Sequence, residues 1–243
     1  MTFSPSFGRP FSPSFKPNSL AEAVVASDWW LSGGISAANC DFAFRAKGAA
    51  DYAASKVNLA NPGTYNASNG AAYPSWSSAG WAFTYANSEY LDVSGLASGD
   101  RPITYIFSLK IGSVSLSQNH AIVSTNTNGA LIIMHDTYFD NATLRRLNGA
   151  EIVTTNRYIL TADEYDIVAL VWYADGSWKS YINGVEDKTG TQTTAVSSGT
   201  VRIGTPVQGG MTAMDGTLAS IARYNTSLTP TQIASLSSAM AAH

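Results

Sequence analysis

Two glycine-containing dipeptides, Asp175-Gly176 and Asn183-Gly184, constrain the fold of this chain more than any other feature. They divide the stretch VALVWYADGSWKSYINGVED, residues 168–187, into three short segments rich in β-branched and aromatic residues. Asp-Gly and Asn-Gly favour two-residue type I′ turns, because both central positions of such a turn need a positive φ. The stretch is therefore predicted to form a three-stranded antiparallel meander.

A two-residue turn at Asp175-Gly176 also predicts the register of the first hairpin. It pairs Tyr173 with Trp178, Val171 with Ser180, and Ala169 with Ile182. One face of the hairpin then carries Tyr173, Trp178, Val171 and Ile182, and the other carries Trp172, Leu170 and Tyr181. Both faces hold aromatic side chains, so we expect the hairpin to lie inside a sandwich and to be covered on its second side as well.

Most of the remaining chain has the alternation and turn residues of short strands. We expect strands at residues 40–46, 81–85, 90–93, 103–111, 121–124, 130–135, 143–147, 151–155, 200–204 and 216–224. Residues 63–80 form a loop-rich stretch that follows Pro62 and contains Pro74, glycines and several Asn and Ser residues. Many strands at short intervals are typical of a two-sheet antiparallel β-sandwich or jelly roll.

The end of the chain changes its hydrophobic period from two to that of a helix. Thr229 is predicted as the N-cap, with Pro230 at N1 and Gln232 at N3, which is the pattern of a capping box. The apolar face of the helix carries Ile233, Leu236 and Met240. The fold class predicted is all-β: a jelly-roll sandwich with a short C-terminal helix and an extended N-terminal arm.

The N-terminal arm, residues 1–17, contains the phrase FSPSF twice. Its prolines exclude a helix or a central strand and favour an extended, polyproline-like chain. A chain with fixed φ loses less entropy when it docks, and aromatic side chains can fill pockets on a neighbour. A disordered tail is the alternative reading. The residues proposed to dock are Phe3, Phe7, Phe11 and Phe15, and residues 18–243 form the folded domain.

The composition narrows the classes of partner. Charged residues are 13% of the chain, Lys and Arg number only 14, and the net charge is −3. Binding to nucleic acid and to a membrane surface both need clustered cations, so neither is expected. The longest apolar run, near residues 167–174, is far short of a membrane span, so insertion into a membrane is not expected either. Cys40 is the only cysteine, which excludes an intrachain disulfide and a cysteine-based zinc site. Prolines interrupt the N-terminus where a signal peptide needs an apolar run, so synthesis in a cytoplasm without a signal peptide is expected.

Three segments together resemble the laminin-G-like branch of the concanavalin A-like lectin/glucanase superfamily. They are WAFTYANSEYLDV at 81–93, VALVWYADGSWKSYINGV at 168–185 and GTLASIARYNTSLTPTQIASL at 216–236. Their order and spacing match over roughly residues 40–240. The earlier segments WWLSGGI, at 29–35, and GAADYAASKVNLANPGTYNAS, at 48–68, resemble variants of this domain in tailed-phage and prophage structural proteins. The resemblance implies a concanavalin A-like sandwich on the surface of a virion.

This superfamily includes glucanases as well as lectins. The retaining glucanases carry Glu-x-Asp-x-Glu or Glu-x-Asp-x-x-Glu along one strand, because two carboxyl groups must flank the scissile bond at about 5–5.5 Å. Glu164 and Asp166 match the start of this motif, but Val168 and Ala169 occupy both positions for the second glutamate. The family mechanism is therefore absent, and no enzyme activity is expected, although carboxylates distant in sequence could still converge. No cofactor is expected either.

Calcium assists sugar binding in relatives of this fold, and it prefers oxygen ligands. Asp136, Asp140 and Asn141 could supply them, the alternative being an ordinary solvated loop.

A carbohydrate site in a lectin needs exposed aromatic faces beside amides and hydroxyls. Candidates lie in or beside the loop-rich sequence and near residue 138, with core packing as the alternative for each aromatic. The candidate carbohydrate-binding residues are Tyr65, Tyr73, Trp76, Tyr85, Asn87 and Tyr138.

Two functions remain open. The first is a non-catalytic virion protein, a decoration, fibre or tail component, that attaches to glycans on the host surface. The second is a purely structural assembly protein without glycan binding, and a glycoside hydrolase is a weaker third. In the first two cases the partners are other virion proteins, reached through the arm, and further copies of the chain in a homo-oligomer.

Overall fold

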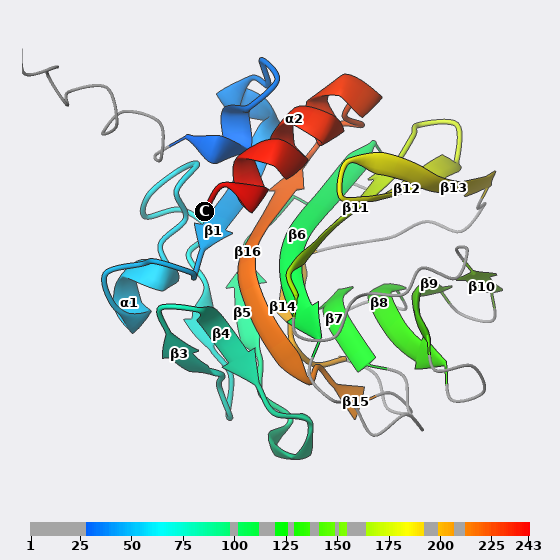
Figure 1. Cartoon of the computed structure of the whole chain (residues 1–243). Coiled ribbons are helices and arrows are strands. Elements are labelled where there is room, and N and C mark those ends of the chain that lie inside the picture. The colour runs from blue at the N-terminus through cyan, green and yellow to red at the C-terminus, as the bar shows by residue number, and fades with distance from the viewer. Residues whose placement is uncertain are drawn as a thin grey trace, which may run out of the picture.

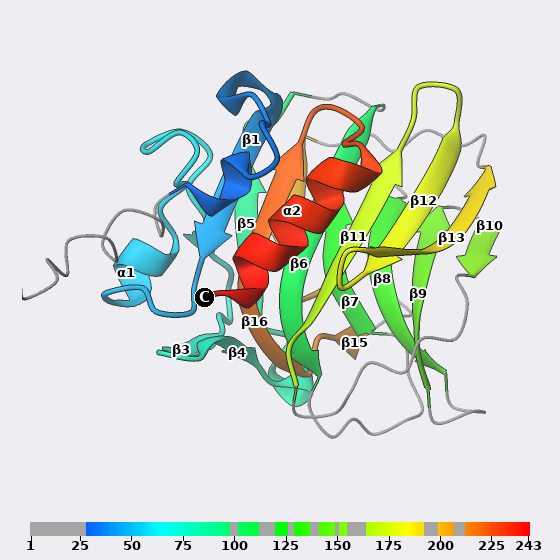
Figure 2. The same ribbon diagram turned by 45° about the horizontal axis from the view of Figure 1, so that its top comes forward.

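The structure is a computed structural model. It describes residues 28–97, 102–111, 120–125, 129–136, 141–148, 151–154, 164–191, 199–206 and 212–243. Within these ranges the chain forms sixteen β-strands, two α-helices and three short 3-10 helices. The strands build two sheets that face each other, and the C-terminal helix α2 (Pro230–Ala241) crosses the outer face of one sheet (Figure 1, Figure 2). The all-β sandwich with a C-terminal helix is thereby confirmed.

The sheet beneath α2, which we call the helix-side sheet, has eight strands. Their order is β13-β12-β11-β6-β16-β4-β3, and β1 also pairs with β16. The bounds are β1 Cys40–Arg45, β3 Ser75–Ser77, β4 Gly80–Phe83, β6 Ile103–Ile111, β11 Asp166–Trp172, β12 Ser177–Ile182, β13 Val185–Thr191 and β16 Gly216–Tyr224.

The second sheet also has eight strands, in the order β10-β9-β8-β7-β14-β5-β2, with β15 paired to β7. The bounds are β2 Ser68–Asn69, β5 Leu91–Ser94, β7 His120–Thr125, β8 Gly129–Asp136, β9 Asn141–Asn148, β10 Glu151–Thr154, β14 Thr200–Ile203 and β15 Thr212–Ala213. Among the described strands every pairing is antiparallel except that of β15 with β7, which is parallel. Strands β2 and β3 stand at the edges of the two sheets.

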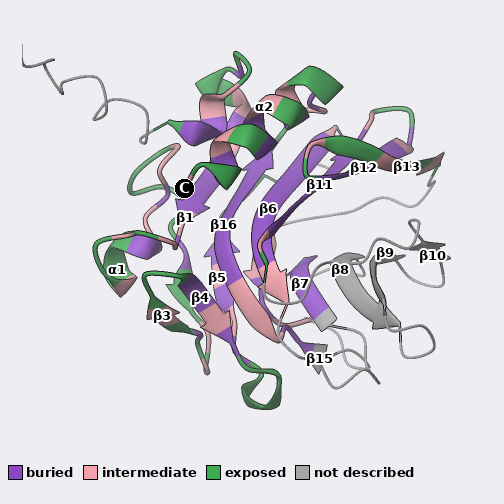
Figure 3. Ribbon diagram, in the orientation of Figure 1, coloured by how far each residue is buried: buried purple, intermediate pink, exposed green. Residues whose placement is uncertain are grey.

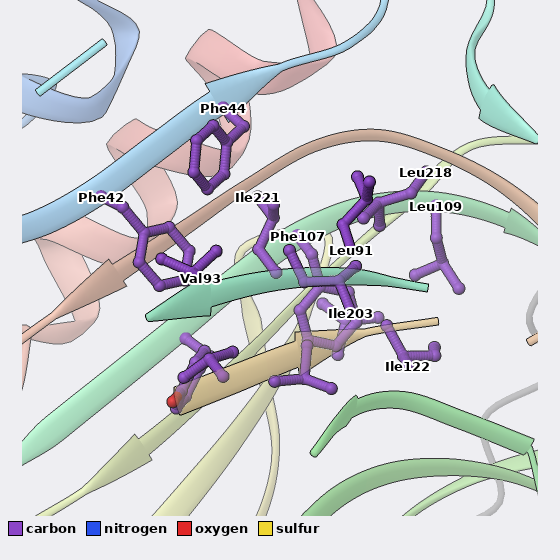
Figure 4. Packing of buried hydrophobic residues seen from close by; sticks show 14 of the residues in the cluster. Phe42, Phe44, Leu91, Val93, Phe107, Leu109, Ile122, Ile203, Leu218 and Ile221 are labelled. Carbon is purple, nitrogen blue, oxygen red and sulfur yellow. The ribbon is translucent and has the colours of Figure 1, made fainter. Parts of the chain in front are cut away.

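The main core fills the space between the sheets. Side chains from β1, β6 and β16 meet side chains from β5, β7 and β14, as Figure 4 shows from close by. The large apolar side chains labelled in that view are at most 3% exposed. Burial of apolar area at roughly 25 cal/mol per Å² makes this interface the principal source of stability.

A second core lies on the outer face of the helix-side sheet, under α2 and the 3-10 helix η1 (Trp29–Leu31). Alternate residues of β6, β11 and β16 point outward here, so these strands are apolar on both faces and appear buried along most of their length (Figure 3). Trp29 and Trp30 close the cluster at 2% and 6% exposure. The expectation that the aromatic hairpin is covered on both sides is confirmed.

The predicted register of the first hairpin is wrong by one residue. Trp172 pairs with Trp178 and Leu170 with Ser180, so the loop is longer than two residues. Gly176 has a positive φ of 88° and donates its N–H to Tyr173 O, whereas Asp175 is not among the residues with positive φ. This geometry is a turn followed by a left-handed glycine, the common three-residue alternative to a type I′ turn.

The shift exchanges the two faces of β11, because side chains alternate along a strand. Trp172, Leu170 and Val168 face the main core together with Trp178 and Ile182, while Val171 faces the second core beside Tyr181. The prediction placed Trp178 with Val171 and Tyr173 instead, which is incorrect.

The other local predictions agree with the structure. Asn183 and Gly184 form the two-residue turn between β12 and β13, with φ of 49° and 82°. Thr229 and Gln232 make the reciprocal hydrogen bonds of a capping box at the start of α2. Several short elements were not predicted. The loop-rich stretch contains β2 and β3, and outside it lie α1 (Tyr52–Ser55) and the 3-10 helices η2 (Ala37–Asn39) and η3 (Tyr85–Asn87).

The N-terminal arm, residues 1–17 with its four phenylalanines, lies outside the described residues, so its docking role stays a prediction. Among the residues that the structure describes, no helix has the length and apolar character required to cross a bilayer.

Candidate functional site

The exposed tyrosine that the sequence singled out, Tyr73, lies where the chain crosses from one sheet to the other. The crossing runs from β2, at the edge of the second sheet, to β3, at the edge of the helix-side sheet. Its path is fixed by Tyr90, whose carbonyl accepts from Gly70 N–H and whose N–H donates to Ala72 O, both at 3.0 Å. The segment that presents Tyr73 is therefore held by the sandwich edge.

The short helix α1 flanks this crossing, as Figure 1 shows beside β3. Asp51 caps it, because its Oδ1 accepts from Ala54 N–H at 2.7 Å. Ser55 is fully buried, and its hydroxyl accepts from the indole N–H of Trp81 at 2.8 Å. A core tryptophan thus anchors α1 to the sandwich and orients Tyr52 and Lys56, which lie four residues apart, toward the crossing.

Four side chains meet here, and we call them the tyrosine cluster: Tyr52, Lys56, Asn69 and Tyr73. The rings of Tyr52 and Tyr73 are stacked, with centroids 5.9 Å apart and an interplanar angle of 26°. Asn69 Oδ1 accepts from Tyr52 Oη at 2.9 Å and from Lys56 Nζ at 2.8 Å. Lys56 Nζ also stands 4.4 Å from the centroid of the Tyr52 ring. Each member is fixed by another, so the cluster is preorganised.

The cluster combines an open aromatic face with polar groups. Tyr73 is 53% exposed, whereas the Tyr52 ring packs partly against the main core. Burial, with smaller contributions from Tyr73 and Glu89, raises the pKa of Tyr52 to about 12. Tyr52 is therefore a neutral hydrogen-bond donor at physiological pH. An exposed ring beside an ammonium and an amide suits a ligand with an apolar face and several hydroxyls.

Glu89 is the carboxylate whose charge acts on Tyr52, and it is itself engaged. It is 8% exposed; Oε2 accepts from Thr84 N–H at 2.7 Å and Oε1 from Asn87 Nδ2 at 2.9 Å. Both oxygens are thus used to hold the turn around η3. That arrangement favours a structural role for Glu89, and also for Asn87, which was predicted to bind sugar.

The remaining predicted sugar-binding residues divide by exposure. Tyr85, in η3, is 37% exposed and follows Thr84 in the turn that Glu89 holds. Trp76 is half-buried against the main core, and its indole N–H donates to Ala46 O at 2.9 Å. Tyr65 also packs on that core, with a φ of 57°. The contacts of Trp76 and Tyr65 favour packing roles, so Tyr73 and Tyr85 are the exposed candidates.

The predicted calcium ligands can be followed only through the backbone. Asp136 ends β8 and Asn141 begins β9, and the two residues are opposite each other in the hairpin register. Asp140 and the sugar candidate Tyr138 lie outside the described residues. Within the described ranges no group of three or more His, Cys, Asp or Glu side chains could hold a metal ion. Calcium at this hairpin stays a prediction.

The partial glucanase motif is placed at the start of β11. Glu164 is exposed, whereas Asp166 is 5% exposed and accepts from Asn183 Nδ2 at 2.8 Å. Asn183 Oδ1 in turn accepts from Ile167 N–H at 2.8 Å. Asp166 therefore takes part in fixing the second turn of the meander to β11.

Tyr52 and Lys56 were not predicted as site residues. The available signal was their spacing of four after the N-cap Asp51, which places them on one side of a helical turn. Nothing in the sequence indicated that Tyr52 would stack on Tyr73.

The described molecule is a lectin-like β-sandwich with a preorganised aromatic cluster at one edge. Residues 85–234 match a laminin G-type family model described as the concanavalin A-like lectin/glucanases superfamily. The match covers more than half of the chain, which therefore belongs to this superfamily. The tyrosine cluster precedes the matched segment. No curated protein matches the chain at the sequence level.

Solved structures with the same fold include domain 4 of a GH43 extracellular arabinanase from Geobacillus stearothermophilus, in complex with arabinotriose. Its TM-score is 0.61 at 16% identity, over 82% of this chain and 98% of that domain. The binding domain of botulinum neurotoxin serotype D has a TM-score of 0.61 at 13% identity, over 83% of this chain and 52% of that one. A Trypanosoma rangeli sialidase mutant has a TM-score of 0.61 at 14% identity, over 85% of this chain and 34% of that one. The chain spans about half or less of the latter two, and the likeness concerns the fold.

Proposed function

We propose that this domain is a non-catalytic carbohydrate-recognition module that binds a polysaccharide at the tyrosine cluster. The observation that carries the proposal is the exposed Tyr73 ring, stacked on Tyr52 and bordered by Lys56 and Asn69. The apolar face of a pyranose can stack on Tyr73, while the ammonium of Lys56 and the Nδ2 of Asn69 bond its hydroxyls. Few convergent polar groups suffice for orientation in such a site.

Two of the proteins of similar fold support a binding role. One of them is solved with arabinotriose, and another is from botulinum neurotoxin type C, whose cell entry is described as dependent upon interaction with two ganglioside molecules. Two carboxylates are the candidates for hydrolysis: Glu89, whose charge acts on Tyr52, and Asp166, from the partial glucanase motif. Both are buried and hydrogen-bonded in structural positions. We therefore expect no hydrolysis of the bound glycan.

The setting that we propose is the surface of a phage particle, with residues 1–17 as the attachment arm. Its support is the resemblance of residues 29–35 and 48–68 to segments of tailed-phage structural proteins. In that setting the domain is a decoration, fibre or tail component, assembled as a homo-oligomer, and glycan binding would serve attachment to the host surface.

The test is binding of a multivalent, labelled form of the protein to an array of bacterial surface polysaccharides. Multivalency is needed because single sugar sites are weak. We expect a specific hit that Tyr73→Ala weakens at least about tenfold, which is about 1.4 kcal/mol. The matched control is Tyr73→Phe, which keeps the ring and should retain most of the binding. The array is run with and without calcium, which also tests the Asp136–Asn141 hairpin.

A blank array with well-folded protein would refute glycan recognition and favour the purely structural function. Binding that Tyr73→Ala leaves unchanged would refute the tyrosine cluster as the site. Release of reducing ends from the bound polysaccharide would contradict the non-catalytic assignment.

A further inference from the structure

A small pocket opens on the outer face of the helix-side sheet, where the last turn of α2 ends. Its volume is about 100 Å³; its polar lining residues are Arg45, Lys47, Tyr165, Ser108, Ser220 and His243, and the rest of the wall is apolar. The end of α2 lies on the side of the molecule that carries α1, β3 and β4 (Figure 1, Figure 2). The pocket is separate from the tyrosine cluster, and none of its lining residues belongs to that cluster.

The pocket is cationic. Arg45 and Lys47 line it, His243 adds a third basic side chain, and no carboxylate side chain is among the lining residues. Burial lowers the pKa of His243, and the charges of Arg45 and Lys47 lower it further. Within the described part of the chain, His243 Nε2 is buried without a hydrogen-bond partner. An anion in this pocket would therefore lie near the ammonium of Lys47, a protonatable imidazole and the guanidinium of Arg45, which already has an interaction within the protein; the α-carboxylate of His243 opposes these charges.

Hydroxyl groups and a fixed ring complete the walls. Ser108 and Ser220 are 4% and 3% exposed, and both line the pocket from the sheet. Tyr165 is held in place because its Oη donates to Ala79 O at 2.5 Å. Its ring lies 4.9 Å from Lys47 Nζ, which restricts the ammonium to the pocket wall. The hydroxyls of Ser108 and Ser220 can donate to the oxygens of an anion, while the fixed Tyr165 ring shapes the wall, and a preformed wall lowers the entropic cost of binding.

The volume of the pocket limits the size of the ligand group that can enter it. Pockets that enclose whole drug-sized ligands measure roughly 300–1,000 Å³, so this one admits a charged group and leaves the rest of its carrier outside. The hairpin of β3 and β4 joins the pocket to the tyrosine cluster. In the turn of this hairpin, Ser78 O accepts from Gly48 N–H and Ala79 O accepts from Tyr165 Oη. Tyr73 lies just before β3. The pocket thus lies near the turn of this hairpin, and Tyr73 lies at its opposite end, before the first strand.

We infer that the pocket binds an oxyanion, and that the oxyanion is the carboxylate of an acidic sugar. The assignment to a sugar rests on the proposed function, whereas the assignment to an oxyanion rests on the pocket alone. A polysaccharide bound at the tyrosine cluster would then be selected for uronic-acid-type residues by this second contact.

The first test is NMR titration of the full chain with sodium glucuronate, with methyl glucoside as the neutral control and inorganic phosphate as a second anion. Glucuronate should shift the signals of His243 and raise its pKa, because a bound anion favours the imidazolium. Methyl glucoside should leave His243 unchanged. Lys47→Gln should raise the Kd for glucuronate roughly fivefold or more, because it removes the attraction of one partly exposed positive charge. Lys188→Gln, on β13, is the matched control and should have no effect.

The outcomes separate this inference from the proposed function. Binding of phosphate but not glucuronate would overturn the sugar assignment, and binding of neither would overturn the site. Equal loss in Lys47→Gln and Lys188→Gln would show that only the net charge matters, which also overturns it. The array with neutral polysaccharides tests the tyrosine cluster independently, since Lys47→Gln should leave those hits unchanged. Thermal unfolding of Lys47→Gln identifies a folding defect, in which case Tyr165→Phe, which removes only the bond to Ala79, replaces it as the test variant.

Discussion

The buried amide of Asn58 offers the sharpest test of how this fold is held together. Asn58 is fully buried in the loop after α1, and its side chain makes four hydrogen bonds to the backbone. Oδ1 accepts from Ala43 and Ala60 N–H, both at 3.0 Å, and Nδ2 donates to Asp41 O and Thr64 O, both at 2.9 Å. One side chain thus ties the loop to the edge of β1.

The magnitude of Asn58→Ala follows from which backbone groups lose their partner. Ala43 N–H is fully buried, and an unsatisfied buried donor costs about 1–3 kcal/mol. The other three groups are partly buried and can be reached by water, so each loses roughly 0.5–1 kcal/mol of net hydrogen bonding. The sum predicts that unfolding becomes easier by about 4 kcal/mol. That is a large share of the roughly 5–15 kcal/mol that stabilises a typical domain.

The assay is urea unfolding followed by the fluorescence of the six tryptophans. The midpoint should fall with little change in the slope m, because the surface exposed on unfolding stays the same. The control is Asn61→Ala, an exposed amide in the same loop, which should change stability by less than about 0.5 kcal/mol. A loss under about 1 kcal/mol in Asn58→Ala would refute the reasoning, because the four bonds would then be replaced by water without cost.

Three further predictions follow from single residues. Gly80→Ala should destabilise the domain markedly in thermal unfolding, because Gly80 has a φ of 129° and an added Cβ would meet Leu218 O at 2.4 Å; an unchanged Tm would contradict this packing. Cys40 should resist alkylation in the folded protein and react after unfolding, because burial raises the pKa of its thiol; mass spectrometry after iodoacetamide checks this, and rapid labelling of the native state would disprove it. The pKa of His243 is lowered in the folded state, so the unfolded chain binds more protons below pH 6.5 and stability falls as pH drops through that range. Comparing Tm between pH 7.5 and 5.5 for the wild type and His243→Gln isolates this effect, and equal pH dependence in both would exclude it.

The fold was predictable wherever the local signals agreed with one another. The bounds of β6 and β16 match the prediction residue for residue, because both are long runs buried on both faces. The capping box at Thr229 was readable since three neighbouring residues specify it together. In such segments propensity, turn chemistry and burial all favour the same structure.

The hairpin at Asp175-Gly176 shows where local reading fails. A dipeptide of this type suits a two-residue turn and also a three-residue loop that ends in a left-handed glycine. The choice is made by packing: the observed register puts Trp172 and Trp178 together in the main core and leaves Tyr181 under α2. Tertiary contacts outside the hairpin therefore decided a register that its own sequence left open.

The candidate sites were harder to predict, because their residues converge from segments that are distant in sequence. Tyr73 was recognisable as an exposed aromatic, but its partner Tyr52 lies on a helix of one turn, whose position depends on tertiary contacts such as the Trp81–Ser55 hydrogen bond. The cationic pocket joins Lys47 from the end of β1 to His243 at the end of α2, almost two hundred residues later. No local pattern encodes that proximity; it follows from β1 and β16 being paired and from α2 folding back across them.

If Asn58→Ala loosens the loop that joins α1 to β2, it should weaken binding at the tyrosine cluster and spare the pocket, since Lys47 is held separately by its N–H bond to Ala219 O. Equal effects on both would mean that the two sites are coupled through β1.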